Sequence, residues 1–312
     1  MRVCALLFTM FHMEEAKKPN KFLSKLIGCI KLMRPHHYLK NGLIVVPLVC
    51  AHMLFDLNSW LVALLGIVSF CFLSSAVYII NDLKDIKKDI NHPKKCHRPL
   101  ASGVVSIPEA IILMVVCLGL CALFNFLTKA NYLSWIFLGC YLIVNIGYSL
   151  GLKRIPILDI LLLSSGFFIR LYYGSVIVDV EVSNWLYLTV VMFSFYFGLG
   201  KRRNELQQLK EEDTRDVLKS YNYLFLDKLM YVCMAVGIVF YSLWCVDPLT
   251  VVALNNRLIW TIPFLVAIVM KYSLDIEGGS SDGDPIEVVL HDKILLVGAA
   301  AFGVGFLLIM YL

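Results

Sequence analysis

The segment A76-V-Y-I-I-N-D-L-K-D-I-K-K-D89 begins inside a long apolar run and ends in charged residues. If the apolar run continues as one helix, Asp82, Asp85 and Asp89 fall at positions i, i+3 and i+7, on a single face. Three aligned carboxylates repel one another, so such a face needs a cation. Mg²⁺ prefers hard oxygen ligands and often binds through one or two carboxylates plus substrate phosphates. The spacing is therefore compatible with a magnesium site at the end of a membrane helix.

A second interpretation is a solvated charged loop, because Lys84, Lys87 and Lys88 alternate with the carboxylates. The spacing alone does not decide between the magnesium site and the solvated loop.

The composition identifies the environment. Hydrophobic residues make up 59% of the 312 residues and charged residues only 16%, with a mean hydropathy of +0.76, which excludes an ordinary soluble domain. Apolar runs long enough to cross a bilayer recur along the chain. We expect an all-α polytopic membrane bundle of about nine transmembrane helices, at 41–56, 59–81, 107–128, 131–150, 157–178, 184–200, 224–246, 257–273 and 292–312.

Lysine and arginine residues predict the orientation. They gather before the first span and in the segments 82–106, 151–156 and 201–223, which places the N-terminus and these loops in the cytoplasm. The acidic segment 274–291 is an exception. We therefore expect a multi-pass protein of the plasma (inner) membrane. The net charge of +5 belongs to these loops and indicates no nucleic-acid partner.

The N-terminal segment 1–33 is expected to be an extension outside the membrane domain, which occupies 34–312. Its first twelve residues resemble a short signal sequence without a cleavage site, and Met13 would be a normal start. The stretch 13–33 reads as an amphipathic segment at the cytoplasmic interface. The ten cysteines form no C-x-x-C pair and indicate neither a disulfide framework nor a zinc site.

Polar residues that need an explanation collect at the predicted cytoplasmic face. Acidic residues for Mg²⁺ and basic residues for phosphate oxygens are the two halves of a diphosphate site. The basic run 201–203 could equally be stop-transfer charges. Asp159 and Arg170, inside a span, could either pair with other helices or serve a site.

The nine-span layout with N-D-x-x-D-x-x-x-D after the second span resembles the UbiA-type intramembrane prenyltransferase superfamily. Further strings resemble its decaprenyl-phosphate phosphoribosyltransferase branch, over about 30–312. These are R34-P-H-H-Y-L-K-N41, H92-P-K-K-C-H-R-P-L-A-S-G103, Y148-S-L-G-L-K153, G166-F-F-I-R170, G200-K-R-R-N-E-L206, K271-Y272 and the acidic stretch 277–287.

One departure from the wider superfamily bears on the substrate. Ordinary members have a second aspartate-rich motif after the sixth span, whereas this chain reads K201-R-R-N-E205 there. A basic segment suits a donor that carries another phosphate group apart from its diphosphate. The basic residues at 201–203 therefore favour phosphoribosyl pyrophosphate as the donor over a prenyl diphosphate.

The resemblance implies an enzyme, a Mg²⁺-dependent pentosyltransferase acting on polyprenyl phosphate in the bilayer. Asp82, Asp85 and Asp89 would be catalytic and would hold the metal, and a homo-oligomer is compatible with the sequence. The expected substrate-binding residues share polar side chains at the cytoplasmic face. They are Asn81 beside the metal, Lys40, Arg98 and Lys153 for the pyrophosphate or the lipid phosphate, Lys201 and Arg202 for the ribose 5-phosphate, Glu205 for a ribose hydroxyl or metal, and Tyr148.

Three alternatives remain at this point: an aromatic-acceptor prenyltransferase, a transporter or channel, and a structural membrane protein. The first should have the second aspartate motif, and the second should show internal repeats with interrupted helices. The acidic loop 275–292 favours a structural or lid role over metal binding.

Overall fold

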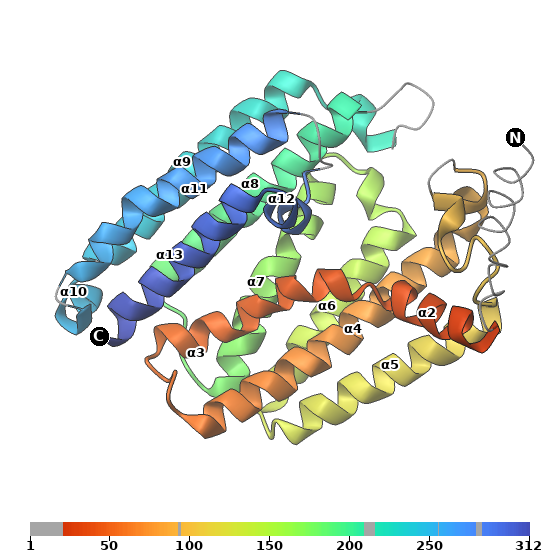
Figure 1. Cartoon of the computed structure of the whole chain (residues 1–312), viewed down its shortest axis with the longest axis horizontal. Helices are drawn as coiled ribbons and strands as arrows, with labels where there is room; N and C mark the ends of the chain where they lie inside the picture. Colours follow the sequence, from red (N-terminus) through yellow and green to blue (C-terminus); the bar gives the residue numbers. More distant parts are fainter. Residues whose placement is uncertain (1–20, 93–94, 209–215, 255, 279–282) are drawn as a thin grey trace, which may run out of the picture.

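The computed structural model describes residues 21–92, 95–208, 216–254, 256–278 and 283–312, and every regular element in these ranges is a helix. The axes of α4, α5, α9, α11 and α13 lie roughly along one diagonal of the view, and α7 stands more steeply between them (Figure 1). The start at Met13 and most of the predicted extension lie outside the described residues. From Lys21 onward the extension forms helix α2 (Lys21–Met33), with Phe22, Leu23 and Leu26 exposed.

Within the described residues, seven helical segments are long and apolar enough to cross a membrane. They are α4 (Leu57–Ile90), α5 (Ile107–Leu127), α6 (Tyr132–Leu150), α7 (Leu158–Val178), α9 (Tyr223–Val246), the joined η6 (Arg257–Thr261) and α11 (Ile262–Glu277), and α13 (Lys293–Tyr311). The all-α polytopic class is confirmed. Helix α8 (Asn184–Gln208) covers the sixth predicted span and is less apolar because its last turns are charged.

The prediction of one α-helix at 41–56 is wrong. The chain there forms a 3-10 helix, η1 (Pro35–Val45), and then a short α-helix, α3 (Val46–Cys50). Gly42 has low helix propensity, and Pro47 cannot donate a backbone hydrogen bond. Tertiary contacts compensate, because η1 packs against both α4 and α7.

Helix α4 extends beyond the bilayer and so carries its acidic end out to the surface. Asp56 caps its start by accepting from the backbone N–H groups of Asn58 and Ser59, each at 3.2 Å. At 34 residues the helix is about 51 Å long, against a hydrocarbon core of about 30 Å. The apolar run and the aspartates therefore belong to one continuous helix, as predicted.

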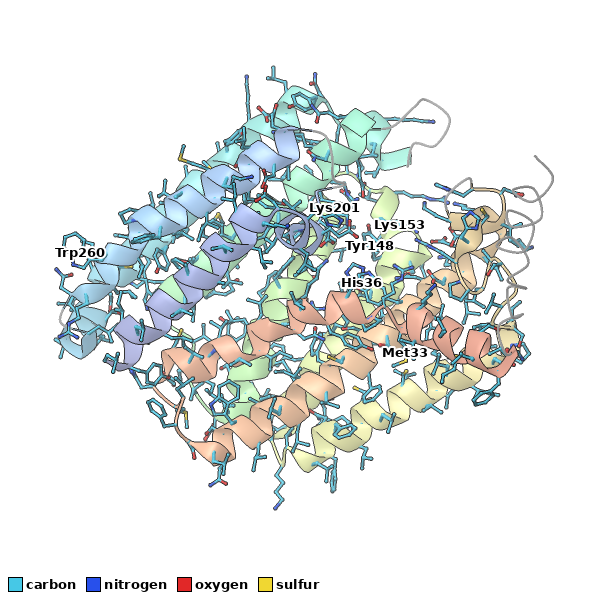
Figure 2. The ribbon with its side chains drawn as sticks, in the orientation of Figure 1. Met33, His36, Tyr148, Lys153, Lys201 and Trp260 are labelled. Atoms are coloured by element: carbon cyan, nitrogen blue, oxygen red, sulfur yellow. The ribbon has the colours of Figure 1, made fainter. Side chains whose placement is uncertain are left out.

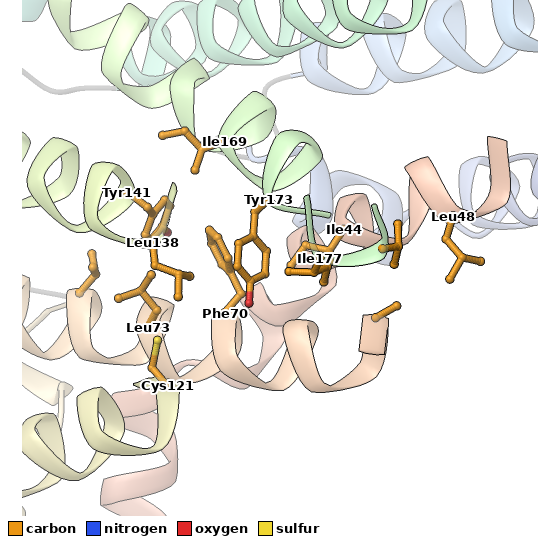
Figure 3. Close-up of a cluster of buried hydrophobic side chains, with 13 residues drawn as sticks. Ile44, Leu48, Phe70, Leu73, Cys121, Leu138, Tyr141, Ile169, Tyr173 and Ile177 are labelled. Carbon is orange, nitrogen blue, oxygen red and sulfur yellow. The ribbon is translucent and has the colours of Figure 1, made fainter. Parts of the chain in front are cut away.

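The remaining described elements are short connections: η2 (Lys95–His97), η3 (Leu152–Arg154), η5 (Asp216–Ser220), α10 (Pro248–Leu254) and α12 (Pro285–His291). Four apolar clusters hold the described part of the bundle together, and two of them are larger than the others. One lies among η1, α3, α4, α5, α6 and α7, where the ring of Phe70 contacts Tyr141 and Tyr173 at centroid distances of 4.7 and 5.5 Å (Figure 3). The other joins α8, α9, α11, α12 and α13.

Helix α7 and η1 approach each other most closely at Gly174. A Cβ atom on Gly174 would lie 2.2 Å from the backbone oxygen of Ile44, closer than any real contact. The absence of a side chain on Gly174 therefore lets η1 lie directly on α7, and this contact places the polar residues that precede Ile44.

We expect Gly174→Val to destabilise the protein by at least about 1–3 kcal/mol, because the backbone of η1 would have to move away. Thermal unfolding in detergent, followed by tryptophan fluorescence, measures the effect. Gly119→Val is the matched control, since a Cβ there meets nothing within 4 Å. Equal melting temperatures for the two variants would contradict the close approach.

Candidate active site

The carboxylates of α4 lie on one face of the helix, and two of them meet the same guanidinium. Arg98 donates from one nitrogen to Asp89 at 2.7 Å and to Asp82 at 3.2 Å, and Arg34 donates to Asp82 at 2.5 Å. Asp82 and Asp89 are only 3% and 4% exposed. Asp82 and Asp89 thus share a partner, as their spacing on one helix predicts, and Arg34 is an additional residue that was not among the predicted site residues.

The third carboxylate faces α6 and the turn that follows it. Asp85 lies 3.4 Å from the ammonium of Lys153, and Lys153 lies over the ring of Tyr148 at 6.0 Å. Next to this pair, the hydroxyl of Ser149 donates to Asn81, and Lys84 donates to the backbone oxygen of Ser149. These contacts join the polar ends of α4 and α6 side by side.

Arg202 is enclosed by partners. Its side chain is 1% exposed and donates to Asp159 at 2.7 Å, to Glu205 at 2.6 Å and to the hydroxyl of Tyr148 at 2.7 Å. Tyr221 donates to the other oxygen of Asp159 at 2.5 Å. Arg202 therefore holds Glu205 and Tyr148 in place, and Asp159 pairs with it from α7.

Lys40 and Lys201 come together on a carboxylate from the acidic loop. The same oxygen of Asp284 accepts from Lys40 at 2.6 Å and from Lys201 at 3.3 Å. Burial by itself would raise the pKa of Asp284, but the two ammonium groups outweigh it and hold that pKa below its usual range. Burial lowers the pKa of Lys40, and Asp284 opposes this shift.

All the residues predicted for the site therefore lie at one end of the bundle. In Figure 2, His36, Tyr148, Lys153 and Lys201 lie in the same region, whereas Trp260 of η6 lies at the opposite end of the bundle. Asp284 was not among the predicted site residues, because a structural or lid role was expected for the whole acidic loop 275–292. The sequence around Asp284 indicates only the start of a helix, because an Asp before Pro at the first helical position is a common N-terminal signature.

Among the described residues, no three His, Cys, Asp or Glu side chains stand close enough together to hold a metal ion. The donor set nevertheless fits a divalent cation. Oxygens of Asp82 and Asp89 already converge on one positive group, the guanidinium of Arg98. Carboxylate oxygens are the ligands that Mg²⁺ selects. Asp82 and Asp89 are thus the residues best placed to hold such an ion, with Asp85 one turn from each.

The fold and site define a helical membrane protein whose carboxylates and basic residues meet at one end of the bundle, a combination suited to phosphorylated substrates. The model of the UbiA prenyltransferase family matches residues 43–276. The chain belongs to this family.

Relatives that are named for an enzymatic activity match most of the chain. It is 32% identical to the decaprenyl-phosphate phosphoribosyltransferase of Corynebacterium glutamicum, over 92% of this chain and 87% of that protein. It is also 32% identical to the enzyme of the same name from Mycolicibacterium smegmatis, over 92% and 94%. Among solved structures, a UbiA homologue from Archaeoglobus fulgidus, bound to GPP and Mg²⁺, aligns with a TM-score of 0.67. That alignment covers 91% of this chain and 100% of the other at 18% identity, and shows the fold.

The neighbours Lys201 and Arg202 should respond differently to substitution. Arg202→Met leaves the buried carboxylate of Asp159 without its cation, and we expect it to destabilise the protein by about 3–5 kcal/mol. Lys201→Met removes a partly exposed ammonium, and the melting temperature should stay close to that of the wild type. Thermal unfolding of both variants in the same detergent is the measurement. A larger decrease in melting temperature for Lys201→Met than for Arg202→Met would contradict a stabilising role of the buried pair of Arg202 and Asp159.

Proposed function

We propose that this protein transfers the phosphoribosyl group of phosphoribosyl pyrophosphate to a polyprenyl phosphate and releases pyrophosphate, in a Mg²⁺-dependent reaction. The observation that carries the proposal is the pair Lys40 and Lys201, two ammonium groups that meet on Asp284. Lys201 belongs to the segment 201–205, where ordinary members of the superfamily have a second aspartate motif. The relatives named for this activity support it over nearly the whole chain.

The α4 face is the proposed place for the donor's pyrophosphate. Bound Mg²⁺ would supply positive charge against the pyrophosphate as the bond from C1 to oxygen breaks. Asp82 and Asp89 would hold the ion, with Asp85 and Asn81 beside them. Arg98, released from these two carboxylates, can then donate to the pyrophosphate oxygens, since a guanidinium forms strong paired hydrogen bonds with phosphate.

The ribose 5-phosphate is assigned to Lys40 and Lys201. This differs from the sequence-based assignment, which placed Lys40 at the pyrophosphate or the lipid phosphate and paired Lys201 with Arg202. The contacts of Arg202 support a positioning role, in which it holds Glu205 and Tyr148 toward the ribose. Glu205 remains the proposed partner of a ribose hydroxyl.

The acceptor would lie with its prenyl chain in the bilayer and its phosphate near Lys153 and Arg34. That phosphate is already an anion at neutral pH, so the reaction needs no general base. Positioning and electrostatic stabilisation would supply most of the rate. Attack in line with the departing pyrophosphate would invert the anomeric carbon. The product, a polyprenylphosphoryl phosphoribose, would serve as a lipid-linked precursor of arabinofuranose units in cell-wall polysaccharide.

The protein is integral to a membrane, and we propose that this is the plasma (inner) membrane, with the site on the cytoplasmic side. Basic residues such as Lys84, Lys87 and Lys153 lie at the site end, whereas Asp179 and Asp247 lie in loops at the other end. This distribution follows the positive-inside rule. A homo-oligomeric state stays a prediction.

The orientation can be tested with alkaline phosphatase fusions in a bacterial host. A fusion after Lys129, between α5 and α6, should be active because that loop would face outward. A fusion after Lys153, between α6 and α7, should be inactive. Activity in the reverse pattern would place the site on the outer face of the membrane.

The activity itself is tested with purified protein in detergent, polyprenyl phosphate, Mg²⁺ and labelled phosphoribosyl pyrophosphate. We expect label to move into the organic phase and a chelator to abolish the transfer. Asp82→Asn and Asp89→Asn should each reduce kcat/KM by about a hundredfold or more, because each removes a charged ligand.

Asp56→Asn is the matched control, since Asp56 caps the opposite end of the same helix and Asn caps equally well. Its activity should equal that of the wild type. Transfer from a prenyl diphosphate to an aromatic acid, with none from phosphoribosyl pyrophosphate, would replace this proposal with the aromatic-acceptor alternative.

A further inference from the structure

Asp284 joins three segments that are far apart in the sequence. Its carboxylate contacts Lys40 of η1, 244 positions away, and Lys201 of α8, 83 positions away, and it stands at the start of α12. The three elements meet at the site end of the bundle, where α12 lies close to α13 and to the end of α8 (Figure 1).

The two oxygens of Asp284 have separate partners. One accepts from the backbone N–H of Ile286 at 3.1 Å and caps α12, and the other accepts from both lysines. The cap of α12 needs only the oxygen that accepts from Ile286, so it does not explain the contacts with Lys40 and Lys201. Asp292 provides the comparison, because it also caps a helix, through Leu295 at 2.7 Å, but pairs with a single lysine, Lys271, and is 30% exposed, whereas Asp284 meets two lysines and its side chain is 4% exposed.

The backbone before Asp284 is held against α8. Gly283 has φ +79°, a conformation that favours glycine, and a Cβ there would lie 3.0 Å from the Cα of Lys201. Tyr272 donates from its hydroxyl to the backbone oxygen of Gly283 at 3.0 Å. Asp284 is therefore presented to Lys201 by a rigid arrangement and not by a chance side-chain rotamer.

The charges of Lys40, Lys201 and Asp284 explain the effect of placing the three side chains together. Both ammonium nitrogens contact one oxygen, so they lie within about 6 Å of each other and would repel in its absence. The carboxylate neutralises one of the two charges and leaves the group with one net positive charge. A phosphate group, whose oxygens accept at about 2.8 Å from each ammonium, fits the same separation.

We propose that Asp284 is a positioning residue, which holds Lys40 and Lys201 together as a two-lysine clamp for the second phosphate of the donor. The inference rests on the proposed function, in which this group is the ribose 5-phosphate. Asp284 then acts through the two lysines and sets the specificity for donors that carry a phosphate away from the pyrophosphate.

The test is Asp284→Asn, which keeps the helix cap and removes the charge. We expect the KM for phosphoribosyl pyrophosphate to rise about ten- to hundredfold, as for the loss of charge-assisted hydrogen bonds. The KM for polyprenyl phosphate should be unchanged, whereas the melting temperature should fall, because Lys40 and Lys201 would repel each other without the carboxylate. Asp284→Glu, which restores the charge, should recover part of the donor affinity. Asp292→Asn is the matched control and should match the wild type in both KM values.

Ribose 5-phosphate tests the clamp without the pyrophosphate. It should inhibit the wild type competitively against the donor and protect it from thermal unfolding, and both effects should weaken in Asp284→Asn. Lys201→Met and Asp284→Asn should be non-additive in the KM for the donor, because Asp284 acts through Lys201.

Three outcomes would overturn the proposal: an unchanged donor KM in Asp284→Asn, tighter binding of ribose 5-phosphate, or equal losses in Asp284→Asn and Asp292→Asn. Tighter binding would mean that the carboxylate competes with the phosphate. The proposed function fails separately, if the wild type itself transfers nothing from phosphoribosyl pyrophosphate. In that event the protection by ribose 5-phosphate still tests the clamp.

Discussion

Charge pairing at one end of a membrane bundle is the constraint on which this structure depends. Carboxylates and ammonium groups at the edge of a low-dielectric medium are costly unless each one meets an opposite charge. Asp82 and Asp89 meet Arg34 and Arg98, Asp159 meets Arg202, and Asp284 meets two lysines. Because the partners come from different helices, neutralising the charges also fixes how the helix ends are arranged.

A second polar cluster, deeper in the bundle, supports the first. Arg170 of α7 donates to Asn41 at 2.7 Å and to the hydroxyl of Tyr141 at 3.1 Å, and lies over the ring of Phe70 at 4.8 Å. Asn41 belongs to η1 and directly follows Lys40. The buried arginine and the Gly174 contact thus hold η1 in its irregular form, and η1 in turn presents Lys40 to Asp284.

The two sides of the site carry different kinds of charged residue. The α4 carboxylates suit the pyrophosphate that any donor of this kind carries, and the related Archaeoglobus fulgidus structure holds GPP and Mg²⁺ on the same fold. The side formed by η1, α8 and α12 supplies Lys40, Lys201 and Asp284.

The sequence by itself determined the helical membrane class, the long α4 and the shared face of its aspartates, because hydrophobicity and helical spacing are local properties. It also marked the residues that gather at the site, since basic loops share one membrane face. Only the tertiary structure decided the 3-10 form of η1, the enclosed position of Arg202 and the place of Asp284. Those depend on contacts between residues up to 244 positions apart, and no local pattern specifies which helix ends will meet.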